Sequence, residues 1–242
     1  MAATAPIFAL HAGGTTPALW DPVRRAAPDL AFVTPDLNHI AELLPGDATY
    51  ADLVDELRNL VPPGPVVLAG ATIGARLALS VASTLGERLQ ALYLLTPTPV
   101  VEDQAFLAKL AGLRRFMMEG FSAAQVEVSL PVMLYRWGPR FTEAADELRR
   151  LLHEGAGPRG MALARRCENL GPQPKELLAT VDAPIEVLFG GADPVLEMAW
   201  PDSWREVPQV RSVEVLPDAS HQLVLQIPGR IAADLRRLAT LP

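Results

Sequence analysis

Thr72 stands between two glycines in the pentapeptide Gly-Ala-Thr-Ile-Gly, residues 70–74. The pattern matches the Gly-x-Ser-x-Gly frame, in which a nucleophilic hydroxyl is raised at a sharp turn between a strand and a helix. An apolar run (66–70) precedes the threonine and an Ala- and Leu-rich segment (73–86) follows it, which predicts that strand and that helix. Alone, the pentapeptide describes no more than a tightly packed strand–helix turn.

A histidine and an aspartate could activate this hydroxyl. His221, in the tetrapeptide DASH, can act as a general base because imidazole titrates near neutral pH. Asp193, in GADP, can accept the Nδ1–H of His221 and stabilise the imidazolium. Both tetrapeptides are also ordinary turns. We predict a triad of Thr72, His221 and Asp193, with Asp218 or Glu102 as the acid if Asp193 points away.

Two backbone N–H groups could hold the oxyanion that such chemistry creates. Ile73 follows Thr72 at the expected start of a helix, and Gly13 lies in the loop HAGG after the first apolar run. We predict these two groups as the oxyanion donors and expect His11 to brace the loop. The loop could instead be a plain glycine turn, and it lacks the Gly-x-Gly-x-x-Gly fingerprint of a dinucleotide site.

Because threonine stands in place of serine, the sequence is compatible with more than one type of reaction. A β-branched residue with positive φ is an outlier that costs roughly 1–3 kcal/mol, and its methyl group restricts χ1. We expect Thr72 to be a poorer nucleophile than serine. Thr72 could also be an engineered replacement of a serine. The leading function is a hydrolase acting on an ester, lactone or thioester. The alternatives are a cofactor-free lyase, cyclase or isomerase with His221–Asp193 as general base and Thr72 as hydrogen-bond donor, and a non-catalytic binding protein.

Six short apolar runs would position these residues. They lie at 7–10, 31–35, 66–70, 91–95, 185–189 and 212–216. Continuous apolar strands separated by helical patterns predict an α/β fold, with a mostly parallel six-stranded sheet and helices on both faces. Helical patterns stand at 50–61, at 73–86 with Gly86 as the expected C-cap, and at 229–241.

About ninety residues separate the fourth and fifth apolar runs, which is far longer than an ordinary loop. Apolar spacing within this stretch predicts helices at 103–121, 141–154 and 160–170. We predict that residues 97–182 form a helical lid inserted into a core made of residues 1–96 and 183–242. An independent helical subdomain without a gating role is the alternative. Phe116, Met117, Met118 and Trp137 could line a pocket, although simple packing is favoured.

The composition excludes several classes of function. The net charge of -7, from 21 basic and 28 acidic residues, argues against nucleic acid or an anionic membrane as partner. Cys167 is the only cysteine, so neither an intrachain disulfide nor a cysteine-based zinc site can form. The first residues lack a basic region, and no apolar stretch reaches the ~20 residues that span a bilayer. We expect a cytoplasmic protein without a cofactor or metal.

Nearly the whole chain resembles the α/β-hydrolase superfamily. Four segments carry the resemblance in the family's order: the oxyanion loop (9–20), the nucleophile elbow (68–79), the acid loop (188–196), and the histidine loop with the last helix (216–235). The resemblance implies the α/β-hydrolase fold, with the predicted lid after the fourth strand. It also implies a small-molecule substrate, which we expect to be an apolar acyl or polyketide-like compound. Ala12 replaces a usual glycine and Gln226 a frequent glutamate, and neither change removes a triad member.

Overall fold

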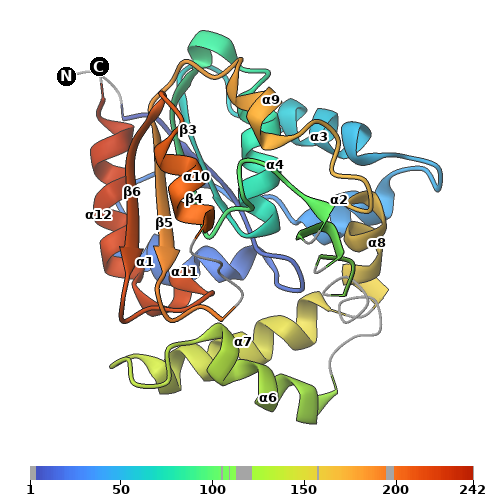
Figure 1. Ribbon diagram of the computed structural model, residues 1–242, viewed down its shortest axis with the longest axis vertical. Helices are drawn as coiled ribbons and strands as arrows, with labels where there is room; N and C mark the ends of the chain where they lie inside the picture. Colours follow the sequence, from blue (N-terminus) through green and yellow to red (C-terminus); the bar gives the residue numbers. More distant parts are fainter. Residues whose placement is uncertain are drawn as a thin grey trace.

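A parallel sheet of six strands forms the centre of the computed structural model, which describes residues 4–104, 106–108, 110–112, 122–156, 158–194 and 199–241. In sheet order the strands are β2 (Phe32–Val33), β1 (Ile7–Leu10), β3 (Val66–Ala71), β4 (Leu89–Leu95), β5 (Ile185–Gly190) and β6 (Val210–Leu216). Each neighbouring pair is parallel (Figure 1). The predicted six-stranded parallel sheet is confirmed.

The sheet separates two apolar cores because alternate residues of a strand point to opposite faces. Along β3, Val67 and Ala69 belong to one core, whereas Val66 and Leu68 belong to the other. All six residues of β3 are buried. Burial on both faces explains why the strand reads in the sequence as a continuous apolar run rather than as an alternating one.

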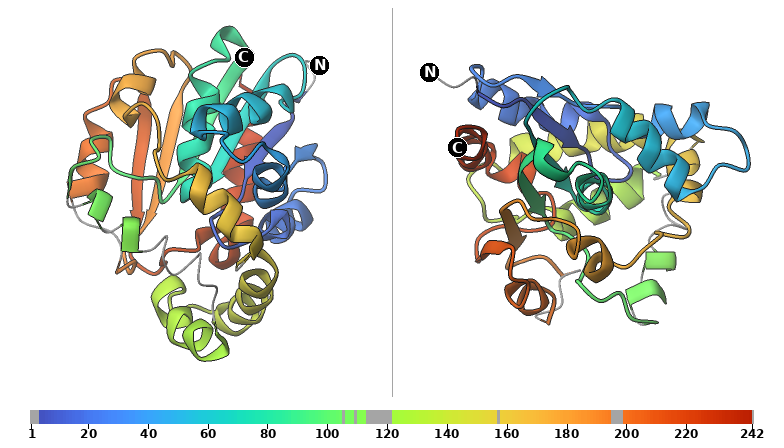
Figure 2. Two further views of the ribbon diagram at one scale, coloured as in Figure 1. Left: turned by 90° about the vertical axis from the view of Figure 1, so that its right-hand side faces the viewer. Right: turned by 90° about the horizontal axis from the view of Figure 1, so that it is seen from above.

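Helices cover both faces of the sheet, as Figure 2 shows. One core is completed by the 3-10 helix η1 (Pro17–Trp20) and by α1 (Asp21–Ala26), α11 (Leu223–Gln226) and α12 (Pro228–Ala239). The other is completed by α2 (Leu37–Leu43), α3 (Tyr50–Asn59), α4 (Ile73–Ala82), α8 (Pro158–Arg166), α9 (Pro174–Leu178) and α10 (Ala199–Arg205). The predicted helices at 50–61 and 229–241 correspond to α3 and α12.

Helix α4 ends earlier than the sequence predicts. It stops at Ala82, and Gly86 instead begins the short 3-10 helix η2 (Gly86–Arg88). The hydroxyls of Ser83 and Thr84 donate to the carbonyls of Ser80 and Val81, at 2.8 and 2.7 Å. Such local side-chain bonds compete with the helical pattern. Gly86 has a φ of 53°, in the left-handed region that a continuing α-helix does not allow.

The segment between β4 and β5 is helical wherever the structure describes a regular element. It contains α6 (Ala123–Met133), α7 (Phe141–Gly155), α8 and α9. Helices α7 and α8 confirm the helices predicted at 141–154 and 160–170. Of the helix predicted at 103–121, residues 105, 109 and 113–121 lie outside the described part of the chain. Figure 1 places α6 and α7 beyond the carboxyl ends of the strands, whereas α8 lies beside α2.

The described helices include none that is both long and apolar enough to span a bilayer.

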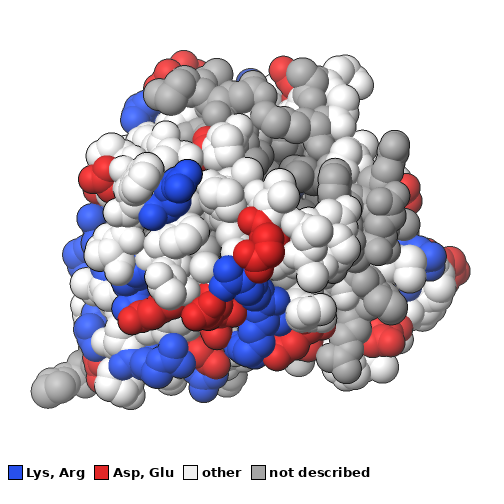
Figure 3. All heavy atoms as spheres, turned by 90° about the horizontal axis from the view of Figure 1, so that it is seen from below, with Lys and Arg blue, Asp and Glu red and all other residues white. Residues whose placement is uncertain are grey.

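On the face formed by α6 and α7, acidic and basic side chains lie next to one another (Figure 3). Arg149 contacts both Glu127 and Asp146, and Arg150 contacts both Glu147 and Glu154. Each of these two arginines therefore bridges two carboxylates, so the four acidic side chains outnumber the two basic ones.

Candidate active site

Thr72 occupies the turn between β3 and α4 in a conformation that threonine rarely adopts. Its φ is 54° and its ψ is -114°. The N–H of Thr72 donates to the carbonyl of Leu95 at 2.9 Å, and the carbonyl of Thr72 accepts from Ala75 at 3.0 Å. A β-branched residue with positive φ is an outlier that costs roughly 1–3 kcal/mol. The predicted strand–helix turn is therefore present, and Thr72 holds a positive φ within it.

The two glycines around Thr72 are required by the close approach of strand, helix and neighbouring loop. A Cβ on Gly70 would lie 2.6 Å from Ala75 Cα and closer still to the carbonyl oxygen of Gly74. A Cβ on Gly74 would lie 2.5 Å from the carbonyl oxygens of Leu10 and His11. The start of α4 therefore packs directly on the end of β1 and the loop that follows it.

His221 and Asp193 meet at the ends of β6 and β5. His221 Nδ1 lies 2.7 Å from Asp193 Oδ2, and the two side chains are 18% and 3% exposed. Because an ionised carboxylate can only accept, Nδ1 carries the hydrogen and Nε2 keeps the lone pair of a base. The backbones are joined as well, since the N–H of Ala192 donates to the carbonyl of Ala219 at 2.9 Å.

Strand β4 brings Thr72 and His221 to the same edge of the sheet. Leu95 accepts the backbone bond from Thr72, and the hydroxyl of the next residue, Thr96, donates to the carbonyl of His221 at 3.4 Å. Across the described residues, however, no hydrogen bond joins Thr72 Oγ1 to His221. The structure thus pairs His221 with Asp193 and holds Thr72 nearby, with its hydroxyl not engaged by the imidazole.

Thr96 is a residue of this edge that the sequence analysis missed. It is buried and has a φ of 45°, so a second β-branched residue adopts the left-handed region beside Thr72. Backbone strain of this kind clusters at functional sites. A possible signal was its position directly after β4 in the run Thr-Pro-Thr-Pro, but that pattern also describes an ordinary loop.

The loop after β1 is held by His11, as predicted. The fully buried His11 ring accepts the N–H of Leu37 on Nε2 at 3.0 Å and contacts the Ala12 carbonyl through Nδ1 at 2.9 Å. Burial lowers the pKa of His11 to about 4. The ring is therefore neutral at pH 7, with the hydrogen on Nδ1, and it serves as a brace.

The two predicted oxyanion donors come from adjoining segments. Gly13 lies in the turn closed by the bond from the Thr15 N–H to the Ala12 carbonyl, 3.2 Å. Ile73 is the first residue of α4, where a backbone N–H has no acceptor within the helix. The contact of Gly74 with this loop places the two segments against each other. Their role as an oxyanion hole stays a prediction.

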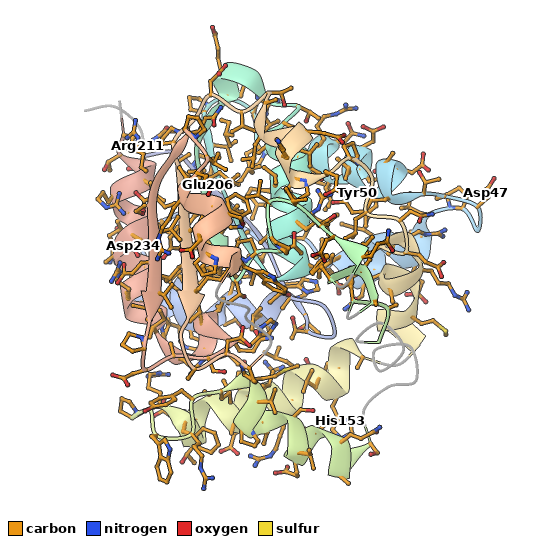
Figure 4. The ribbon with its side chains drawn as sticks, in the orientation of Figure 1. Asp47, Tyr50, His153, Glu206, Arg211 and Asp234 are labelled. Atoms are coloured by element: carbon orange, nitrogen blue, oxygen red, sulfur yellow. The ribbon has the colours of Figure 1, made fainter. Side chains whose placement is uncertain are left out.

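The other residues that the sequence analysis considered lie apart from the pair of His221 and Asp193 or have other partners. Asp218 is exposed, and Glu102 accepts from the buried guanidinium of Arg76 at 3.0 Å, so neither replaces Asp193. His39 is exposed on α2, and His153 lies on α7 at the periphery (Figure 4). Phe116, Met117 and Met118 fall outside the described residues, and Trp137 is 73% exposed. The described residues hold no group of three His, Cys, Asp or Glu side chains suited to a metal.

A buried ion pair beneath the elbow also escaped the sequence analysis. Arg76, one turn after Thr72, bonds Glu102 Oε1, Ser80 Oγ at 3.2 Å and the Leu170 carbonyl at 3.1 Å. Its NH2 group also donates to the carbonyl of Pro172. Tyr50, in the interior beside α4 (Figure 4), contacts Ser80 Oγ at 2.9 Å. The guanidinium therefore ties α4 to the segments that leave β4 and that follow α8.

A family model described as the alpha/beta hydrolase family matches residues 7–234. The chain is 22% identical over 208 residues to Protein PHYLLO, chloroplastic, of Arabidopsis thaliana, with 78% of this chain covered. It spans only 12% of the length of that protein.

Solved structures with the same architecture include two esterases. The malate-bound esterase of Thermogutta terrifontis has a TM-score of 0.77 at 23% identity, covering 98% of this chain and 91% of its own. The esterase of Exiguobacterium antarcticum has a TM-score of 0.73 at 12% identity, covering 99% and 93%. MenH from S. aureus has a TM-score of 0.72 at 15% identity, covering 98% and 94%. At these identities the likenesses establish the fold.

Proposed function

Because this chain belongs to the alpha/beta hydrolase family, we propose that it hydrolyses an ester, lactone or thioester with Thr72 as the nucleophile. The observation that carries the proposal is the positive φ of Thr72 at the turn between β3 and α4. A β-branched residue has no structural reason to hold this conformation, which raises its side chain at the carboxyl edge of the sheet. Structural likeness to esterases supports the same class of reaction.

The proposed mechanism uses the five predicted residues. Thr72 Oγ1 bonds to the carbonyl carbon while its proton passes to His221 Nε2, and Asp193 stabilises the resulting imidazolium. The N–H groups of Ile73 and Gly13 hold the oxyanion. His221 then protonates the departing alcohol or thiol, an acyl-threonine remains, and a water activated by His221 releases the acid.

The segment between β4 and β5 would shape the substrate site. We propose that residues 97–182 act as a lid on a core made of residues 1–96 and 183–242. The end of α7 supports this role, because a Cβ on Gly155 would lie 2.7 Å from Thr15 Cα in the loop that carries Gly13. The substrate that we propose is a small apolar acyl or polyketide-like molecule.

A second candidate function rests on the missing bond between Thr72 and His221. His221 has its carboxylate partner, so it can remove a proton from a substrate without the threonine. Thr72 would then donate a hydrogen bond to a carbonyl or hydroxyl of the substrate. Such a site would catalyse an elimination, cyclisation or isomerisation without a cofactor.

Substitutions at the two residues separate these functions. With Thr72 as nucleophile, Thr72→Ala abolishes hydrolysis of p-nitrophenyl acyl esters, and Thr72→Ser raises it by removing the crowding methyl group. With His221 alone as base, Thr72→Ala keeps substantial turnover of the true substrate, because one hydrogen bond is worth only ~0.5–1.5 kcal/mol. Thr84→Ala, two residues beyond the far end of α4, is the control and keeps full activity.

A fluorophosphonate probe followed by intact mass gives an independent test. We expect one covalent adduct on the native chain and none on Thr72→Ala. If the native chain remains unlabelled while Thr72→Ser reacts readily, the acyl-threonine mechanism is wrong. The general-base function would then take its place.

A further inference from the structure

The loop that carries His221 is bonded on both sides of the histidine to the end of α6. Ser220 Oγ donates to the carbonyl of Val132 at 2.8 Å. The N–H of Gln222 donates to the carbonyl of Met133, also at 2.8 Å. The two neighbours of His221 therefore each hold one of the last residues of this helix.

These contacts act as the C-terminal cap of α6. The last four carbonyls of a helix have no partner within it. The Leu130 carbonyl accepts from the N–H of Leu134 at 2.8 Å, and the carbonyls of Val132 and Met133 are satisfied by the histidine loop. Withdrawing α6 from this loop would break both of these hydrogen bonds.

Gln226 adds a third connection through one oxygen atom. Its Oε1 accepts the N–H of Tyr135 at 2.7 Å and the N–H of Ser220 at 3.3 Å. Both partners only donate, so the oxygen must face them and the orientation of the amide is fixed. The Nε2 atom of Gln226 is buried and has no partner among the described residues. The amide thus accepts hydrogen bonds from two backbone N–H groups, whereas its own N–H groups donate to none of the described residues.

Resting on the proposed hydrolytic function, we propose that Gln226 is a positioning residue that couples the segment after α6 to the loop of His221. Ser220 directly precedes the histidine, and Tyr135 follows the end of α6 by two residues. One acceptor shared by both backbones makes the two segments move together. A substrate that contacts α6 would therefore shift the position of the His221 imidazole without contacting Gln226.

Two substitutions and a matched control test this coupling. Gln226→Leu removes the acceptor at similar volume, whereas Gln226→Glu keeps an acceptor oxygen for both N–H groups. Gln90→Leu is the control, because the Gln90 amide also bonds two backbone groups, the carbonyls of Leu238 and Leu241. Gln90 stands at the start of β4, the end of the strand opposite to Thr96. Ester hydrolysis gives kcat and KM, and hydrogen exchange followed by mass spectrometry gives local opening.

We expect Gln226→Leu to lower kcat by about 10- to 100-fold with little change in KM, because the imidazole is misplaced. Gln226→Glu should recover most of kcat, and Gln90→Leu should leave it unchanged. In the hydrogen-exchange measurement, Gln226→Leu should raise the exchange rate of the amides in both peptides, 130–136 and 219–226.

Faster exchange in 219–226 alone, with 130–136 unchanged, would overturn the coupling, as would equal losses in the Glu and Leu variants. Hydrogen exchange needs no turnover. If the chain proves not to hydrolyse esters, the two peptides still report whether Gln226 joins these segments, so failure of the proposed function and failure of the coupling are distinguishable.

Discussion

Thr72 adopts a backbone conformation that glycine tolerates and a β-branched residue does not. Its φ of 54° places the Cβ substituents against the backbone, at a cost on the order of 1–3 kcal/mol. The neighbouring glycines relieve crowding around the turn but not the strain within Thr72 itself. The molecule is therefore less stable than a glycine at this position would allow.

Replacing the residue should expose this cost. We expect Thr72→Gly to raise the free energy of unfolding by about 1 kcal/mol, because relief of strain exceeds the extra entropy that glycine loses. Urea unfolding measures the change. Ser83→Gly, at the ordinary backbone angles of φ -61° and ψ -12° after the same helix, should instead lower it by roughly 0.5–1 kcal/mol. A loss of stability in Thr72→Gly would show that the turn is relaxed.

The elements around the elbow are connected by the ion pair of Arg76 and Glu102. The two side chains are 0% and 3% exposed, and the guanidinium also bonds the carbonyls of Leu170 and Pro172. One side chain thus holds α4, the segment after β4 and the segment after α8 in a fixed arrangement. The geometry of the elbow depends on elements distant from it in the sequence.

Breaking this pair should be far more costly than breaking a surface pair. Arg76→Met leaves the carboxylate of Glu102 buried without its partner, so we expect the free energy of unfolding to fall by about 3–5 kcal/mol. The double variant Arg76→Met with Glu102→Leu should recover much of that loss, because no unpaired charge remains buried. Urea unfolding of the two single variants and the double variant completes the double-mutant cycle that checks this. Asp55→Ala, which removes the exposed partner of Arg58, is the control and should change stability by less than about 1 kcal/mol.

Strands β1, β3, β4 and β5 could be predicted because burial on both faces leaves continuous apolar runs in the sequence. The same reasoning places Asp193 after β5 and His221 after β6, and the structure joins their side chains. Helix α6 could not be found in this way. It carries Val126 buried and Val128 exposed, so its apolar residues lie on all sides, and it contains Pro131. Neither an amphipathic period nor a favourable composition marks it.

The supports of the candidate site could not be predicted for a different reason. Arg76, Thr96 and Gln226 act through partners that are 26 or more residues away, or through backbone atoms. Such contacts are set by how loops meet at the edge of the sheet, and a local pattern does not encode them. The catalytic roles of Thr72, Asp193 and His221 remain predictions.

The molecule as a whole should lose stability in mild acid because of one buried ring. Burial lowers the pKa of His11 to about 4, whereas the unfolded chain has the ordinary value near 6.5. Between these values the unfolded state binds more protons than the folded one. The free energy of unfolding therefore falls as the pH drops from about 6.5 to about 4, by about 3 kcal/mol in all, and this contribution levels off below that range.

Thermal or urea unfolding at several pH values between 7 and 4 measures this dependence. His11→Asn should remove most of the slope in that window, whatever its effect on stability at pH 7. His153→Asn, at an exposed position on α7, should leave the slope unchanged. An unchanged slope in His11→Asn would mean that other groups set the acid sensitivity.

The two ends of the described chain lie side by side. The N–H of Ala5 donates to the carbonyl of Ala239 at 3.1 Å, and Figure 1 places both termini at the end of the molecule opposite α6 and α7. A fluorophore, a fusion partner or a solid support attached at either end is therefore kept away from the carboxyl edge of the sheet. Molecules immobilised in this way would present that edge to the surrounding solution.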